Sequence, residues 1–502
     1  MTASLTDKFI SARAVSTPLI YISTTDPAAT VASAYEALVS SKLDGPKVQW
    51  DCARGVRAID PTGKDADSRK AEKLFDIGAT NPTEMLMAAF KLPEFSILFA
   101  HNLGRFLDPV TVQAIWNLRD EFKHNRRTLV ILGPSGTLPP ELTNDVLVLD
   151  EPLPSREQLE SIVRRTHVHA KLEVTDEGVA RAVEAVQGLA AFPAEQATAM
   201  SLRKSGLDLD DLWERKRQMI EQTPGLKVYR TGEKFTDIGG VENIKASLRR
   251  IMNGKNRPNA VVFIDEIEKA MAGVEGDMSG TSQDQLGVIL TYMQDHCADG
   301  MIFVGPPGAA KSAVAKAAGN EAGVPTIQLD LGATKGNLVG QSEQQIRSAL
   351  KTITAVSNDR SLWIATCNSI GILKPELMRR FADGKYFFDL PDDAERAAIW
   401  RIWRNKFEID DNYDLPDDVG WTGAEIRQCC KVACYQGMNL EDAAEQIVPV
   451  CRSAAGTIER LRRESSGVFL NASRPGVYEF NPHEAVGREA AGNSRRFDLS
   501  EK

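Results

Sequence analysis

Residues 301–322 combine a short apolar run, a glycine-rich loop and a helical segment. Met301–Val304 has the composition of a buried strand, and Gly-Pro-Pro-Gly-Ala-Ala-Lys-Ser follows at 305–312, before the alanine-rich helical stretch. A loop between a strand and a helix N-terminus can surround a phosphate chain with backbone N–H groups. Lys311 and Ser312 stand where an ammonium and a Mg²⁺-binding hydroxyl are needed. The pattern predicts a phosphate-binding loop in a parallel α/β sheet.

This loop departs from the usual GxxxxGK[ST] pattern at one position. Ala310 stands where the last glycine is expected, and a Cβ is tolerated there only if the backbone does not need a glycine conformation. We still expect the loop to bind ATP, because an ordinary turn explains neither the Lys-Ser pair nor the following helix. The expected nucleotide contacts are Gly305, Pro306, Pro307, Gly308, Ala309, Ala310, Lys311, Ser312 and Ala313.

A second apolar run, Val261–Ile264, ends in the two carboxylates Asp265 and Glu266. At the carboxyl edge of the sheet, Asp265 would bind Mg²⁺ and Glu266 would polarise an attacking water. The run precedes the phosphate-binding loop, whereas the usual order places the loop first. A parallel sheet determines which strands are neighbours, not which is made first, so we expect one ordinary site within a single subunit. The alternative is a strand exchanged with a neighbouring subunit.

The first 200 residues alternate buried strands with helices, which predicts a second α/β unit. The predicted strands are 18–23, 95–101 and 128–133, and the predicted helices are 30–41 and 111–124. Gly133–Thr137 imitates the start of a phosphate loop, but Leu138-Pro139 then replaces the Gly-Lys step. We therefore expect this unit to bind no nucleotide.

The changes of pattern along the chain predict five parts. These are a degenerate ATPase-like domain with a helical cap (1–200), a linker (201–234), an α/β nucleotide-binding domain (235–391), a helical lid (392–465) and a mobile tail (466–502). The expected fold class is thus α/β, a P-loop NTPase sheet with permuted strand order and a helical lid, preceded by a degenerate domain.

Several motifs together resemble the AAA ATPases related to the cell-division-cycle, metalloprotease and severing ATPases. They are Phe235–Gly240, the GPPG loop, FIDEIEK, Val339–Glu343 followed by Ile346-Arg347, and Ile364–Asn368. The resemblance covers about residues 235–435. The inactive-looking first unit, with the phrases LVILGPSGTLPPEL and DEPLPSREQL, is also similar to a plastid and cyanobacterial AAA family of poorly known function.

The resemblance implies further roles for single residues. Asn368 matches the polar residue that orients the attacking water, and Lys311 and Glu266 match the catalytic pair. Arg379 and Arg380 match the region that supplies arginine fingers to a neighbouring subunit's ATP, and which of the two reaches it is left open.

The resemblance also implies contacts at the edges of the site. Ile238 and Gly239 match the segment that contacts adenine, and Gly423 and Ala424 match the approach of the lid to the nucleotide. Leu338 and Val339 match the pore loop. Because Leu338 replaces the usual aromatic residue, it would grip a threaded chain only by apolar contact.

Composition bears on partners and compartment. The net charge of −9 argues against nucleic acid as the main partner. Seven cysteines without a CxxC pair suit a reducing cytoplasm, and the N-terminus has no apolar run of signal or anchor length. We therefore expect a cytoplasmic protein. The resemblance, with arginine fingers that act on a neighbouring subunit, implies that it is a Mg²⁺-ATP hydrolysing ring, of hexameric form, that remodels a protein partner. The alternatives are a nucleic-acid motor and an ATP-gated scaffold with little turnover.

Overall fold

The computed structural model describes residues 4–481 apart from 25, 42, 44, 60–65, 76–78, 135–137, 205, 231, 272–280, 297, 334–340, 372, 374 and 411–413. The chain divides into two compact units. The first comprises Met1–Val183 and Leu189–Leu207, and the second comprises Glu184–Gly188 and Asp208–Lys502.

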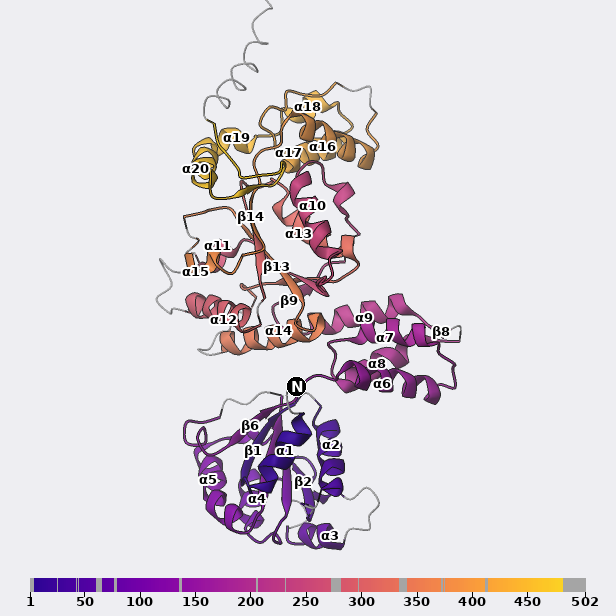
Figure 1. Ribbon diagram of the computed structural model, residues 1–502, viewed down its shortest axis with the longest axis vertical. Coiled ribbons are helices and arrows are strands. Elements are labelled where there is room, and N and C mark those ends of the chain that lie inside the picture. The colour runs from indigo at the N-terminus through magenta and orange to yellow at the C-terminus, as the bar shows by residue number, and fades with distance from the viewer. Residues whose placement is uncertain are drawn as a thin grey trace, which may run out of the picture. The chain divides into compact units, whose positions relative to one another are not determined.

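The first unit is built on a six-stranded sheet in the order β3-β2-β4-β5-β1-β6 (Figure 1). Its strands are parallel except for the hairpin of β2 and β3. The strands are β1 (Leu19–Ser23), β2 (Lys47–Asp51), β3 (Gly55–Ala58), β4 (Ile97–His101), β5 (Thr128–Gly133) and β6 (Leu147–Asp150). The three predicted strands form as β1, β4 and β5, and β2, β3 and β6 are additional strands that were not predicted.

Helices cover this sheet and extend the unit beyond it. They are α1 (Leu5–Ala14), α2 (Pro27–Ser40), α3 (Ala66–Glu72), α4 (Pro82–Ala89), η1 (Leu103–Phe106), α5 (Pro109–His124), α6 (Arg156–His169), α7 (Asp176–Val186) and α8 (Ala191–Ser201), followed by the short hairpin β7 (Leu202–Arg203) and β8 (Gly206–Leu207). Alternate residues of each strand enter opposite cores, as Leu19 and Tyr21 enter one while Ile20 and Ile22 enter the other. The predicted helices form as α2 and α5.

The second unit contains a seven-stranded sheet in the order β15-β14-β11-β13-β10-β12-β9. Only β9 runs antiparallel to its neighbour. The strands are β9 (Leu226–Val228), β10 (Ala260–Ile264), β11 (Gly300–Val304), β12 (Thr326–Leu329), β13 (Ser361–Cys367), β14 (Gly384–Phe387) and β15 (Leu470–Asn471). The acidic strand β10 is separated from the phosphate-loop strand β11 only by β13, which is one of the two arrangements that a site within a single subunit permits.

Helices pack on both faces of this sheet and form the lid (Figure 1). They are α9 (Leu209–Glu221), η2 (Phe235–Asp237), α10 (Glu242–Met252), α11 (Ile267–Met271), α12 (Thr281–Asp295), α13 (Lys311–Ala322), α14 (Gln341–Ser357), α15 (Pro375–Met378), α16 (Asp393–Lys406), α17 (Gly423–Gln436), α18 (Leu440–Ala444), α19 (Val450–Ser453) and α20 (Ala455–Ser465). Helices α10 and α13 share one core with the sheet, and α12 and α14 share the other. Among the described helices, no stretch combines the length and apolar character that crossing a bilayer requires.

The two sheets have the same strand arrangement. Aligning β1 with β11 places β5 on β13, β4 on β10, β2 on β12 and β6 on β14. In the first unit β1 precedes β4 along the sequence, whereas in the second unit the counterpart of β4, which is β10, precedes the counterpart of β1, which is β11. The same spatial order is therefore reached by two different orders along the chain.

The predicted mobile tail is wrong for residues 466–481, which pack against the second unit. Leu470–Asn471 pairs with β14, and the side chains of Phe469 and Tyr478 are buried in its core. The Tyr478 hydroxyl donates a hydrogen bond of 2.7 Å to the Asp389 carboxylate. Local periodicity could not reveal this order, because it comes from contacts with residues distant in the sequence. Residues 482–502 lie outside the described part.

Candidate active site

The phosphate-binding loop is closely packed between the end of the sheet and the lid. A Cβ on Gly305 would lie 2.1 Å from the Phe388 carbonyl oxygen, and one on Gly308 would lie 2.7 Å from the Thr422 hydroxyl. Both glycines therefore permit backbone approaches that a larger residue would block. Of the other predicted contacts in the loop, Pro306 and Ala309 are buried, Pro307 is exposed and Ala313 is half-buried on α13.

Lys311 begins α13 and is 6% exposed. Its Nζ donates hydrogen bonds of 2.7 Å to the carbonyl oxygens of Gly305 and Pro306, so the ammonium lies over the loop that would hold phosphates. Burial lowers the pKa of Lys311 to about 8, and nearby carboxylates, Glu268 first among them, oppose this fall. A buried ammonium that needs an anion is well suited to bind phosphate oxygens.

Ser312, Asp265 and Thr366 join three elements at one point. The hydroxyls of Ser312 and Thr366 donate to the same Asp265 oxygen, at 2.8 and 2.7 Å, and Thr366 in turn accepts the Glu266 backbone N–H at 2.9 Å. The two motifs that are reversed along the chain therefore meet within one chain, as predicted. A hydroxyl beside a carboxylate is a donor set that suits Mg²⁺, which prefers oxygen ligands.

Glu266 lies at the start of α11 with both carboxylate oxygens in contact. Its backbone φ is +49°, a left-handed conformation that is uncommon for a residue with a side chain. Asn368 Nδ2 donates to Oε1 at 3.2 Å, and the Lys269 ammonium pairs with Oε2. Glu266 and Asn368 were predicted to share the site, whereas the contact with Lys269 was not predicted, although the i+3 spacing of Glu266 and Lys269 indicated the pair.

Ala310 adopts a left-handed backbone conformation that normally favours glycine, although we expected an alanine to be tolerated here only outside such a conformation. Its φ of +66° and ψ of +7° place it in the left-handed region, directly before α13. An L-residue pays roughly 1–2 kcal/mol in this region, whereas glycine does not. The loop thus keeps the glycine geometry and carries strain at this residue.

We expect Ala310→Gly to raise the free energy of unfolding by about 0.5–1 kcal/mol, because relief of strain exceeds the greater flexibility of glycine in the unfolded chain. The measurement is denaturant unfolding of the transition that ATP shifts. Ala313→Gly, in the helical backbone of α13, is the matched control and should lower stability. A loss of stability in both variants would contradict strain at Ala310.

The two candidate finger arginines differ in their surroundings. Arg380 is half-buried and its Nη2 donates to Gln294 Oε1 on α12 at 2.6 Å. Arg379 is exposed, and its side chain makes no hydrogen bond or ion pair within the part of the chain that the structure describes. Of the two arginines, Arg379 is therefore the more exposed and the less engaged within the described chain.

The predicted adenine-contact segment lies against the lid. Ile238 is buried in the same core as Ala309, and a Cβ on Gly239 would lie 2.6 Å from the Ile399 side chain of α16. The start of α17 approaches the phosphate loop, where Ala424 lies near Gly308. The structure thus brings Ile238, Gly239, Gly423 and Ala424 to the same side of the site.

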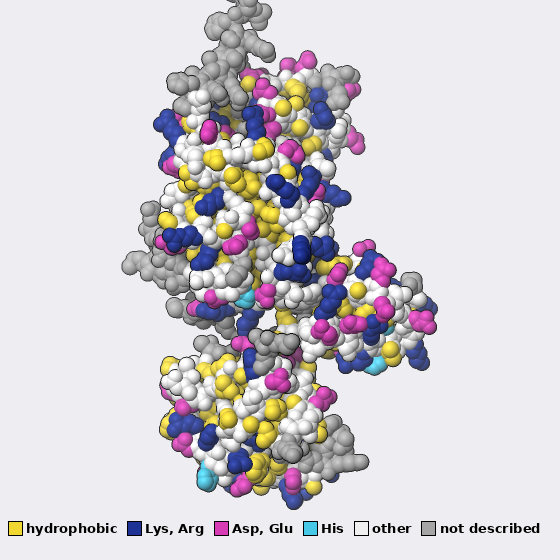
Figure 2. Space-filling view, in the orientation of Figure 1, with side chains coloured by type: hydrophobic (Ala, Val, Ile, Leu, Met, Phe, Trp, Pro, Cys, Tyr) yellow, Lys and Arg dark blue, Asp and Glu magenta, His cyan; other side chains and the backbone are white. Residues whose placement is uncertain are grey.

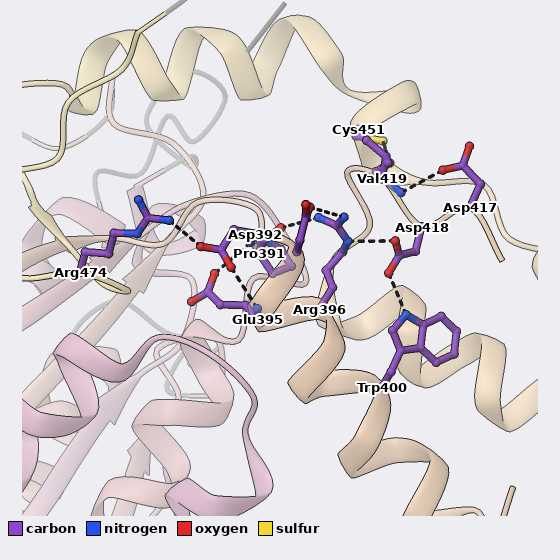
Figure 3. A network of polar contacts seen from close by, with 11 residues as sticks. Pro391, Asp392, Glu395, Arg396, Trp400, Asp417, Asp418, Val419, Cys451 and Arg474 are labelled. Atoms are coloured by element: carbon purple, nitrogen blue, oxygen red, sulfur yellow. Dashed lines mark hydrogen bonds and ion pairs between the residues drawn. The ribbon is translucent and has the colours of Figure 1, made fainter. Parts of the chain in front are cut away.

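A polar network holds the lid to the sheet domain (Figure 3). Arg474 donates to Asp392, which caps α16, at 2.7 Å. Arg396 pairs with Asp418 at 3.0 Å, and Trp400 Nε1 donates to the same carboxylate at 2.8 Å. Because Glu395 also accepts the Val241 N–H at 2.9 Å, α16 is joined both to the lid loop and to the adenine-contact segment.

In the first unit, carboxylates lie near the position that corresponds to the phosphate loop of the second unit. The equivalent position follows β1, not β5, so the imitation at Gly133–Thr137 stands at the wrong strand, and its residues 135–137 lie outside the described part. After β1, the Asp26 carboxylate accepts the Ala29 N–H at 3.1 Å. The nearby Thr30 hydroxyl donates to Glu151 at 2.8 Å. Carboxylates at this helix N-terminus would repel phosphate.

The predicted pore-loop residues Leu338 and Val339 lie outside the described residues.

Three family matches cover successive parts of the chain. Residues 4–151 match the N-terminal domain of SpoVK-like AAA ATPases, and residues 156–223 match their second domain. Residues 301–358 match the ATPase family associated with various cellular activities (AAA). The chain therefore resembles AAA ATPases in three successive segments.

Proteins similar to this chain include several described as uncharacterized AAA domain-containing protein ycf46. The one from Guillardia theta is 24% identical, over 76% of this chain and 81% of its own. The one from Gracilaria tenuistipitata var. liui is 25% identical, over 71% and 77%. The ATP-dependent zinc metalloprotease FtsH 3 of Sphaerobacter thermophilus is 24% identical, over 43% and 57%. These similarities confirm the predicted resemblance to the plastid and cyanobacterial type.

Proposed function

We propose that this AAA protein binds Mg²⁺-ATP at residues 305–312, hydrolyses it, and uses the cycle to remodel a protein partner as part of a hexameric ring. The observation that carries the ATPase proposal is the 2.8 Å contact between Ser312 and Asp265. It brings the phosphate loop and the acidic strand into one site, with Lys311 and Glu266 on either side.

Each residue of the proposed site has a distinct task. Lys311 binds β- and γ-phosphate oxygens, while Ser312 and Asp265 would hold Mg²⁺, whose charge offsets that of the phosphates. Glu266 accepts a proton from the attacking water, and Asn368 orients that water. The Glu266–Lys269 ion pair must open before Glu266 can act, because both of its carboxylate oxygens are in contact here.

The ring is proposed from Arg379. An exposed guanidinium without a partner among the described residues can stabilise charge on a neighbouring subunit's γ-phosphate, and a finger that acts in trans requires that neighbour. A closed cyclic arrangement provides one such contact per site.

We further propose that the second unit is a permuted AAA fold and that residues 1–200 are its degenerate counterpart. The shared strand arrangement supports this, as does the AAA match, which begins at Met301 and leaves out the acidic strand β10. The α/β part would end near residue 391, where α16 opens the lid.

One alternative is an ATP-gated scaffold with little turnover. The strained Ala310 and the doubly held Glu266 carboxylate favour it. A nucleic-acid motor is less well supported, because the net charge is −9 and acidic side chains are interspersed with basic ones on the face in Figure 2.

Nucleotide binding tests the proposal directly. Lys311→Ala should weaken ATP binding by about 100-fold or more, because it removes the buried cation that faces the phosphates. Titration of the full chain with a fluorescent ATP analogue measures the affinity. An assay of ATP hydrolysis, run with and without single-stranded DNA, separates a protein remodeller from a nucleic-acid motor and from a scaffold with little turnover.

Lys316→Ala, on the same helix, is the matched control and should bind ATP normally. The Lys316 ammonium lies over the rings of Tyr229 and Phe263. Saturable micromolar binding that persists unchanged in Lys311→Ala would contradict the assignment of Lys311 as the phosphate-binding cation.

A further inference from the structure

A third carboxylate, Glu268, contacts the same asparagine as the proposed base. Its Oε1 accepts the Asn368 backbone N–H at 3.0 Å and the Asn368 Nδ2 at 2.8 Å. Its Oε2 is buried and has no hydrogen-bond partner among the described residues. No role was expected for Glu268 from the sequence, and a buried carboxylate oxygen of this kind calls for an explanation.

The donors of Asn368 determine how its side chain is oriented. A primary amide carries two N–H donors on nitrogen and one acceptor oxygen. Glu266 and Glu268 both present carboxylate oxygens, which only accept, so the nitrogen end must face them. The oxygen end, Oδ1, is then the end that can accept a hydrogen bond from another group.

This orientation matters for hydrolysis, because water has two O–H bonds to place. One O–H bond of the water can donate to Glu266, which takes the proton, and the other can donate to Asn368 Oδ1. These two hydrogen bonds together orient the lone pair on the water oxygen toward the phosphate. An Asn368 amide turned around would present a donor to that water and repel its hydrogen.

We propose that Glu268 is a positioning residue, which locks the Asn368 amide with its oxygen toward the attacking water. The inference rests on the proposed ATP hydrolysis and adds a residue to that site. Glu268 acts as a hydrogen-bond acceptor for both Asn368 N–H groups, not as a base or a metal ligand, and its effect therefore passes through Asn368.

The test measures turnover and ATP affinity of the full-length protein in a set of Glu268 and Asn368 variants. Glu268→Ala removes the acceptor and should lower kcat about tenfold or more with little change in Kd for ATP. Glu268→Gln keeps an acceptor oxygen and should recover most of the lost rate. A charge-based role predicts instead that Glu268→Gln is as slow as Glu268→Ala, and this result would overturn the proposal.

A double-mutant cycle provides the second readout. In an Asn368→Ala background, Glu268→Ala should change kcat less than twofold, because the group it positions is gone. Equal effects of Glu268→Ala with and without Asn368 would contradict the proposal. Thermal unfolding of each variant confirms folding, and Glu268→Gln, which preserves shape, answers the question if Glu268→Ala unfolds.

Failure of the underlying function has a different signature. If the wild-type protein shows no ATP turnover, or if its turnover survives in Lys311→Ala, the ATPase proposal itself is wrong. If that turnover is present but the cycle is additive, only the role of Glu268 is wrong.

Discussion

Glu266→Gln is expected to lower ATP turnover by about 10²–10⁴-fold while ATP binding is retained. The amide of glutamine occupies the same volume but cannot accept a proton from water. Glu266 is a half-buried carboxylate that lies between Asn368 and Lys269, and it contacts no residue of the phosphate loop in the hydrogen bonds and ion pairs of the described chain. Its loss should therefore change the chemical step and leave affinity nearly unchanged.

The measurement combines phosphate release at saturating ATP with a binding titration. Glu376→Gln, an exposed carboxylate on α15 in the same unit, is the matched control and should behave as wild type. Equal turnover in wild type and Glu266→Gln would remove Glu266 from the reaction, and a scaffold with little turnover would then explain the site better.

Arg379→Ala should lower turnover by about 10³-fold or more, the usual contribution of an arginine finger. The neighbouring Arg380→Ala is the matched control. Because Arg380 is already bonded to Gln294, its removal should cost a small amount of stability and much less turnover. If Arg380→Ala proves the slower variant, the choice between the two arginines is wrong.

A mixing experiment tests whether Arg379 acts on a neighbouring subunit. Arg379→Ala subunits keep Glu266, and Glu266→Gln subunits keep Arg379, so an equal mixture creates interfaces with both groups intact. With random assembly, roughly a quarter of wild-type turnover should return, although each variant alone is inactive. No recovery after confirmed subunit exchange would argue against a finger in trans.

The three strands of the candidate site could be predicted from the sequence because each carries its own local signal. Apolar runs end at Asp265, at the glycine-rich loop and at Asn368, and the chemistry of the site requires their ends to meet. Right-handed parallel connections leave few ways to bring this about. These requirements predicted β10 either beside β11 or separated from it by one strand, whatever the order along the chain, and the structure shows the second arrangement.

The sequence alone could not identify the contacts that complete the site, because their partners are distant in the chain. Glu268 contacts Asn368 across a separation of 100 residues, and nothing local to FIDEIEK indicates that pairing. The choice between Arg379 and Arg380 depended on Gln294, which belongs to another helix. The left-handed backbone of Ala310 appeared only once the loop was closed against the sheet and the lid.

Residues 466–481 show the same division between local and tertiary information. Their composition has no periodicity, so the sequence predicted a mobile tail. Tertiary structure decided otherwise, because the open edge of β14 offers backbone partners to Leu470–Asn471 and the core offers a place for Phe469 and Tyr478. Local patterns thus determined which segments of this protein carry the chemistry. The packed sheet determined which side chains contact those segments, since these contacts exist only after distant strands have met.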